Sequence, residues 1–259
     1  MVNGRDAVMR RHRGDGPTLV LLHGAGGNHM SYDDLLVHLG NVDVVVPSLP
    51  GRCDSAGEPL ATVAEMATWT GALLGVLGLR QVVVMGHSLG GAIALELALS
   101  RAAGRPELTG LILACTGARL RVLPAILAMM EQAAESGMPT EMGAQVFRSD
   151  TDPGMIDRAL QVWGRTPASV ALADWRAADA FDRMEGLGEV SVATVVLAGS
   201  EDQMTPPKYA RYLAEHIPNA RLELLEGAGH MLVAEEAGRV AELVRGIVRA
   251  EGAAQIAAT

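Results

Sequence analysis

Short apolar runs, rich in valine, leucine and isoleucine, recur along the chain and predict buried β-strands. These runs lie at residues 19–22, 42–46, 82–85, 108–114, 194–197 and 222–225. Residues 7–11 are a candidate for a further, antiparallel strand at the edge of the sheet. Strands that are apolar along their whole length are typical of a parallel sheet that helices cover on both faces.

Between these runs, the apolar residues follow the spacing of helices. The predicted helices lie at residues 32–39, 60–77, 89–102, 206–216 and 234–249. Strands and helices thus alternate without a linker or a low-complexity segment. This alternation predicts one α/β domain with a mostly parallel sheet, and 259 residues suffice for it.

One long segment interrupts the alternation. Residues 117–188 show helical periodicity without a convincing strand, so we expect a helical cap. Much of the chain's methionine and aromatic content lies here, and packing between cap helices explains each such residue without any further role. Flexible, polarizable methionine also suits an adaptable apolar pocket. The candidate pocket residues from this segment are Met129, Met130 and Trp163.

The strongest chemical motif follows the apolar run at residues 82–85. The sequence from Gly86 to Gly90 has the pattern Gly-x-Ser-x-Gly and precedes a predicted helix. In this context the pattern predicts a sharp strand-to-helix turn that exposes the hydroxyl of Ser88. The first N–H groups of a helix have no partner within it, so they can bind the oxyanion that forms when serine attacks a carbonyl.

Three other loops carry polar residues just beyond predicted strands. A glycine-rich segment from His23 to Gly27 follows residues 19–22, Asp202 follows residues 194–197, and His230 follows residues 222–225. The carboxyl ends of parallel strands share one edge of the sheet, where ligands of open α/β folds bind. We therefore expect these loops and Ser88 to form one site, with Gly24 and Met231 in its pocket.

These motifs resemble those of the α/β-hydrolases, esterases and lipases with a serine nucleophile and a cap, in which Ser88, Asp202 and His230 would follow in the family's order. The resemblance covers nearly the whole chain. It implies a helix-flanked sheet with the cap inserted after the sixth strand. The core domain would comprise residues 1–116 and 189–259, and the cap residues 117–188.

A further segment, residues 47–55, resembles the loop that follows an early strand in this family. Two of its positions depart from the common pattern, because Ser48 stands where aspartate is frequent and Cys53 where glycine is frequent. Neither position carries the chemistry. The departures leave the conformation of this loop open.

The resemblance also implies roles for the residues of the site. His230 would take the proton of Ser88, Asp202 would orient the imidazole, and an acyl-serine would then react with water. The backbone N–H groups of Ala25 and Leu89 would form the oxyanion hole. Asp202 has two alternatives: it could begin a helix, or Glu201 could be the acid instead.

The preferred function is hydrolysis of carboxylic esters with small to medium apolar acyl groups. The main alternative is a carbon–carbon bond or enol-lactone hydrolase of aromatic degradation, whose anionic substrates need an arginine near the nucleophile. Five arginines of the expected cap are candidates for this role, and the sequence does not rank them: Arg119, Arg121, Arg148, Arg165 and Arg176. A hypothesis of another class is a ligand-binding receptor with little turnover.

Charge and composition exclude several partners. The net charge of −9 opposes binding to nucleic acids and to anionic membrane surfaces. The chain has no apolar run of about 18 residues and begins without the apolar core of a signal peptide, so we expect a cytoplasmic protein. The two cysteines, Cys53 and Cys115, fit neither a disulfide framework nor a metal site. We expect no metal and no cofactor, and the oligomeric state stays open.

Overall fold

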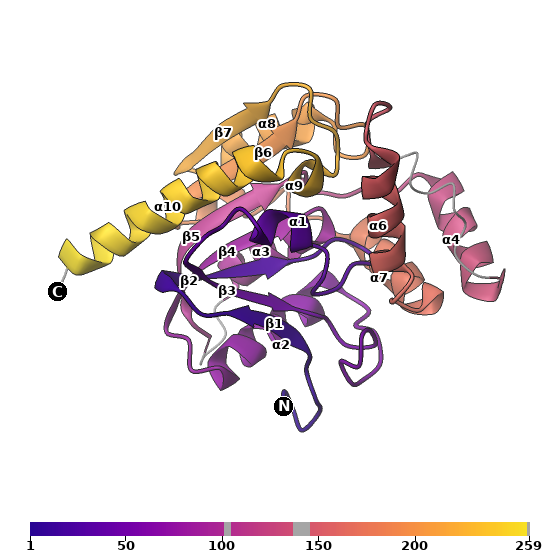
Figure 1. Ribbon diagram of the computed structural model, residues 1–259, viewed down its shortest axis with the longest axis horizontal. Helices are drawn as coiled ribbons and strands as arrows, with labels where there is room; N and C mark the ends of the chain where they lie inside the picture. Colours follow the sequence, from indigo (N-terminus) through magenta and orange to yellow (C-terminus); the bar gives the residue numbers. More distant parts are fainter. Residues whose placement is uncertain (101–104, 137–145, 258–259) are drawn as a thin grey trace.

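A seven-stranded sheet forms the centre of the protein, shown as a computed structural model in Figure 1. The structure describes residues 1–100, 105–136 and 146–257. The strand order is β1-β3-β2-β4-β5-β6-β7, and only β1 runs antiparallel to its neighbour. The strands are β1 (Met9–His12), β2 (Asp15–Leu22), β3 (Val42–Pro47), β4 (Gln81–His87), β5 (Glu107–Ala114), β6 (Thr194–Gly199) and β7 (Ala220–Leu225).

Helices cover both faces of the sheet, because alternate strand residues point to opposite faces and both sets are apolar. In β2, for example, Val20 and Leu22 pack on one face and Leu19 and Leu21 on the other. The first face carries α2 (Val63–Val76), α3 (Leu89–Leu99) and α8 (Pro207–His216). The second carries α1 (Asp33–Leu36), α9 (Leu232–Glu235) and α10 (Ala237–Ala257).

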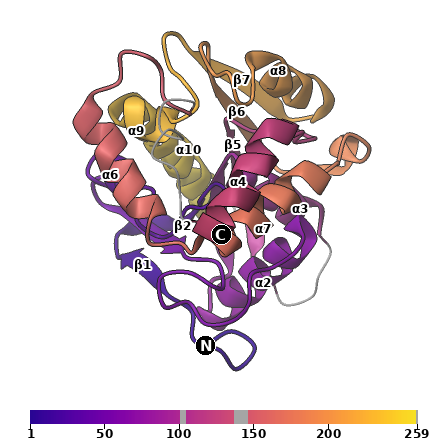
Figure 2. The ribbon, with the colours of Figure 1, turned by 90° about the vertical axis from the view of Figure 1, so that its right-hand side faces the viewer.

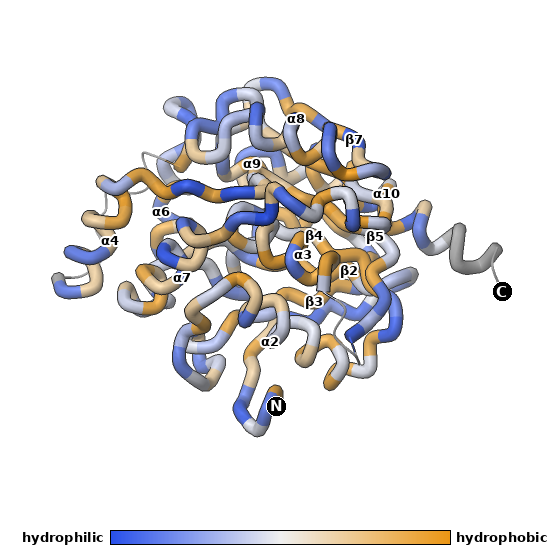
Figure 3. The backbone as a smooth tube through the Cα atoms, turned by 180° about the vertical axis from the view of Figure 1, so that it is seen from behind, coloured by the Kyte–Doolittle hydropathy of each residue, from blue (hydrophilic) through white to orange (hydrophobic). Residues whose placement is uncertain are grey.

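This architecture confirms the predicted α/β-hydrolase fold, and the expected antiparallel edge strand is β1. Figure 3 shows the central strands mostly in orange, the colour of hydrophobic residues. The last helix runs to Ala257 instead of ending at residue 249, since the alanine-rich end of the chain favours helix. None of the described helices is both long enough and apolar enough to cross a bilayer.

In the described residues between β5 and β6 lie the helices α4 (Pro124–Ser136), α6 (Pro153–Trp163) and α7 (Ala168–Ala180), followed by a short 3-10 helix, η2 (Leu187–Glu189). We call residues 117–188 the inserted segment. Helices α4, α6 and α7 group at one end of the sheet, at the right of Figure 1 and facing the viewer in Figure 2.

The insertion follows the fifth strand of the chain, so the expectation that it follows the sixth was wrong. The reason lies at the N-terminus. Residues ahead of Met9 form only an isolated bridge between Val2 and Arg5. One strand fewer therefore precedes the inserted segment than the family resemblance implied.

Candidate active site

The turn between β4 and α3 holds Ser88 in a strained backbone conformation. Its φ of 55° and ψ of −121° lie in a region that residues other than glycine rarely adopt. Hydrogen bonds fix the turn on both sides: the Ser88 N–H donates to the Ala114 carbonyl at 2.9 Å, and the Thr116 hydroxyl donates to the Ser88 carbonyl at 2.8 Å. Strain held in this way is typical of functional sites.

Two glycines make this turn sterically feasible. A Cβ on Gly86 would lie 2.0 Å from the carbonyl oxygen of Gly90, and a Cβ on Gly90 would lie 2.0 Å from that of Leu22. Both distances are far inside van der Waals contact with backbone atoms, so no side chain fits at either position. The Gly-x-Ser-x-Gly pattern thus lets α3 begin directly against the ends of β2 and β4.

Two backbone N–H groups near Ser88 are free to bind an oxyanion. Leu89 is the first residue of α3, and Ala25 lies in the loop after β2. Within the described parts of the chain, neither N–H has a hydrogen-bond acceptor. A Cβ on Gly24 would lie 3.3 Å from the Cβ of Ser88, which shows how closely this loop approaches the serine.

His230 and Asp202 form a buried pair between the loops after β7 and β6. The Nδ1 of His230 lies 2.9 Å from Oδ2 and 3.1 Å from Oδ1 of Asp202, whose side chain is 0% exposed. Since Asp202 engages Nδ1, the other nitrogen of the imidazole is left for a second partner. His230 and Ser88 line the same two cavities.

The carboxylate of Asp202 also accepts hydrogen bonds from its own loop. The N–H groups of Met204 and Thr205 donate to it at 2.9 Å, and the Thr205 hydroxyl at 2.7 Å. Burial alone would raise the pKa of Asp202, but the charge of His230 and the hydrogen bonds from His230 and Thr205 outweigh burial and lower the pKa to about 2. Asp202 thus organises its loop and faces His230, whereas Glu201 is exposed.

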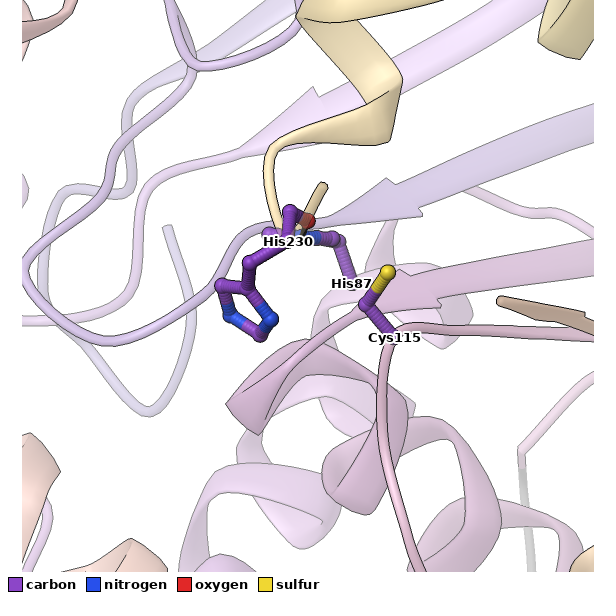
Figure 4. A group of neighbouring side chains, drawn as sticks. All are labelled: His87, Cys115 and His230. Atoms are coloured by element: carbon purple, nitrogen blue, oxygen red, sulfur yellow. Dashed lines mark hydrogen bonds between the residues drawn. The ribbon is translucent and has the colours of Figure 1, made fainter. Parts of the chain in front are cut away.

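His87 and Cys115 lie close to His230, as Figure 4 shows. Each is held by a hydrogen bond: His87 Nε2 donates to the His230 carbonyl at 2.8 Å, and the Cys115 thiol donates to the Gly229 carbonyl at 3.8 Å. Burial and the charge of His230 lower the pKa of His87 to about 3, and burial raises that of Cys115. Both side chains are therefore neutral at pH 7 and support the backbone of the His230 loop.

His23 supports the loop that carries Ala25. Its Nδ1 donates to the Gly24 carbonyl at 2.9 Å, and its Nε2 accepts the Leu49 N–H at 3.4 Å, which assigns the neutral tautomer. Burial and the charge of Arg52 lower the pKa of His23 to about 4. We infer that His23 braces this loop.

Two cavities meet at Ser88. The smaller has a volume of about 50 Å³ and lies toward α6, and the larger has a volume of about 190 Å³ and lies toward α4 and α8. Ala25, Ser88, Trp175 and His230 line both. Of the predicted pocket residues, the structure places Gly24, Trp163 and Met231 in the smaller cavity.

The other two predicted pocket residues lie elsewhere. Met130 is fully buried between α4 and α7 in a cluster with Ile126 and Leu172, and Met129 packs against the same cluster. Both take part in the packing between α4 and α7, which accounts for them. Trp175, which lines both cavities, was not among the predicted pocket residues, although it is one of only three tryptophans.

The fold and the chain order of the three polar residues are those of the α/β-hydrolase class. The chain belongs to the alpha/beta hydrolase family, whose family model matches residues 19–243. It is 30% identical to the "Putative carbamate hydrolase RutD" of Pseudomonas savastanoi pv. phaseolicola, over 86% of this chain and 90% of that protein.

Two further relatives are named as esterases. The pimeloyl-acyl-carrier protein methyl ester esterase of Neisseria meningitidis serogroup C is 29% identical, over 88% of this chain and 92% of the relative. The structure of a thermophilic esterase from Thermogutta terrifontis superposes with a TM-score of 0.83 and 27% identity, covering 95% of this chain and 94% of that one.

Proposed function

We propose that this protein is a serine hydrolase that cleaves carboxylic esters. Ser88 attacks the ester carbonyl, and His230 takes the serine proton and then gives it to the leaving alcohol. The N–H groups of Ala25 and Leu89 hold the oxyanion, and water releases the acyl group from Ser88. One observation carries the proposal: His230, which is paired with the buried Asp202, lines the same two cavities as the strained Ser88.

The volume and the lining of the two cavities indicate the size and the polarity of the substrate. Both cavities have mainly apolar linings, with Trp163, Trp175 and Met231 in the smaller one. A volume of about 50 Å³ accepts a short acyl chain, whereas about 190 Å³ accepts a larger group. Small to medium apolar acyl esters therefore fit the site best. The names of two relatives, both esterases, support the same reaction class.

The proposal includes a division of the chain into two parts. Residues 1–116 and 189–259 form the hydrolase core, and the inserted segment is a cap that closes the substrate site. Trp163, at the end of α6, and Trp175, on α7, support this division because they line cavities that contain Ser88.

A series of p-nitrophenyl esters from acetyl to dodecanoyl tests this function. We expect turnover by the wild type with an optimum at short to medium chains, and its loss in Ser88→Ala. Ser191→Ala, which changes an exposed serine, serves as the control and keeps wild-type rates. Equal turnover by Ser88→Ala and wild type contradicts the mechanism, and no turnover by the wild type at any length contradicts the general esterase activity.

A carbon–carbon bond or enol-lactone hydrolase is the second candidate, because cationic side chains line the larger cavity. Of the five arginines considered for this role, Arg121 lines that cavity, together with Lys208. Esters that carry a free carboxylate discriminate between the two functions. A preference for them over neutral esters of equal length favours the second candidate, and the reverse preference favours the first.

A further inference from the structure

A buried ion pair joins the inserted segment to the core. Arg52 lies in the loop after β3 and Asp174 on α7, and both side chains are 0% exposed. The pair is bidentate, with N–O distances of 2.6 and 2.9 Å. The Arg52 Nε is buried without a hydrogen-bond partner in the described structure. A buried pair that is incompletely satisfied is weak evidence for a role in stability.

The same pair contacts the loop that carries Ala25. The Gly26 N–H donates to Asp174 at 2.9 Å, and Arg52 donates to the Gly27 carbonyl at 3.3 Å. Two further bonds tie this loop to the inserted segment. The Asn28 side chain donates to the Val162 carbonyl at 2.7 Å, and the Thr166 hydroxyl donates to the Gly27 carbonyl at 3.4 Å. Three consecutive loop residues are thus held from outside the loop.

We propose that the Arg52–Asp174 pair positions the oxyanion loop, so that the Ala25 N–H points at the substrate only while α7 is docked on the core. The inference rests on the proposed function, since it assigns the Ala25 N–H to the oxyanion hole. Ala25 directly precedes Gly26, whose N–H Asp174 holds. An oxyanion donor acts through its position, so freeing the neighbouring peptide misplaces it. Arg52 and Asp174 are positioning residues in this account.

Two double variants distinguish whether the ion pair positions the Ala25 loop or only attaches α7 to the core. Arg52→Met/Asp174→Leu removes the ion pair without stranding a buried charge, and it also removes the acceptor for the Gly26 N–H. Arg52→Met/Asp174→Asn removes the same pair but keeps an amide oxygen as the acceptor. The two proteins therefore differ in the bond to Gly26.

We expect kcat for a p-nitrophenyl ester to fall on the order of 10²-fold in the leucine variant, as for loss of an oxyanion donor. The asparagine variant should keep a clearly higher kcat than the leucine variant. KM should stay near the wild-type value in both, because the interaction acts in the transition state. Hydrogen exchange of residues 24–28 should be faster in the leucine variant.

A matched control uses another ion pair of the same region. Arg183, just beyond α7, makes a bidentate pair with Glu96 on α3 at 2.6 and 2.7 Å, and no contact of this pair involves the Ala25 loop in the described structure. Arg183→Met/Glu96→Leu should leave kcat and the exchange of residues 24–28 unchanged. Circular dichroism and thermal melting establish that each variant is folded.

The proposal is overturned if the leucine variant is folded and keeps both the wild-type kcat and the wild-type hydrogen exchange of residues 24–28. It is also overturned if both double variants lose kcat equally. If the leucine variant does not fold, Arg52→Met/Asp174→Ala replaces it, because alanine also lacks the acceptor and cannot clash. Hydrogen exchange needs no turnover. If the wild type hydrolyses no ester, the proposed function fails while the exchange comparison still decides whether the pair positions the loop.

Discussion

Asp202 shows how one side chain serves both a loop and a site. Its two oxygens accept three hydrogen bonds from Met204 and Thr205 and also face the Nδ1 of His230. The loop bonds fix the carboxylate in place, and the carboxylate then fixes the imidazole. The sequence left open that Asp202 begins a helix, but helix α8 begins only at Pro207. In the structure the same carboxylate makes both sets of contacts.

We predict that Asp202→Asn lowers kcat on the order of 10⁴-fold, by comparison with the same change in a serine protease. The amide can present an NH₂ group to His230, which would stabilise the wrong tautomer of the imidazole. Ester turnover at saturating substrate measures the effect. The neighbouring change Glu201→Gln, at an exposed side chain, is the control and should leave kcat almost unchanged. Wild-type activity in Asp202→Asn would show that Asp202 is not the acid.

At the scale of elements, the site depends on the close approach of three backbones. The start of α3 packs against the ends of β4 and β2 at distances that exclude a Cβ at Gly86 and Gly90. The helix therefore begins where the hydroxyl of Ser88 and the N–H of Leu89 meet the Ala25 loop. Strand register places these ends together, because Leu22 of β2 pairs with Gly86 of β4.

Gly90→Ala should lower the free energy of unfolding by about 3 kcal/mol, the upper end of the usual range for overpacking. The cause is the contact that its Cβ would make with the Leu22 carbonyl. Gly246→Ala on α10 is the matched control, since a Cβ there meets no atom within 4 Å. It should raise stability by up to about 1 kcal/mol through helix propensity. Urea denaturation measures both, and equal effects would contradict the steric argument.

At the scale of the whole molecule, buried neutral histidines make the fold sensitive to acid. The pKa of His23 is lowered from 6.5 to about 4 and that of His87 to about 3, in each case first through burial. Both support loops of the site. When the protein unfolds below pH 6.5, both imidazoles take up protons that the folded state does not bind. The stability that they contribute is present above pH 6.5 and is lost as the pH falls toward 4 and 3.

We therefore predict that the free energy of unfolding decreases as the pH falls from 6.5 to 4, by up to about 1.4 kcal/mol per pH unit for each of the two histidines. In His87→Gln the slope should be smaller by about that amount, since one group is removed. Urea denaturation at pH 7, 6 and 5 gives the two slopes. Identical slopes in the variant and the wild type would contradict the contribution of His87.

Much of the fold and part of the site could be predicted from sequence, because the relevant forces are local. The apolar runs predicted β2 to β7, since a strand that helices cover on both faces is apolar over most of its length. The Gly-x-Ser-x-Gly pattern predicted the sharp turn, since only glycine fits at Gly86 and Gly90. The strand ends predicted that the loops of Ser88, Asp202 and His230 meet at one edge.

Only the tertiary structure decided how the inserted segment meets the core. A helical methionine has the same local pattern whether it faces a cavity or another helix, so Met130 was assigned to the pocket and lies in helix packing. For the same reason the local pattern did not reveal the position of Trp175 or the Arg52–Asp174 pair, whose residues are 122 positions apart. Periodicity specifies which face of an element is apolar, whereas the partner of that face follows from packing over the whole chain.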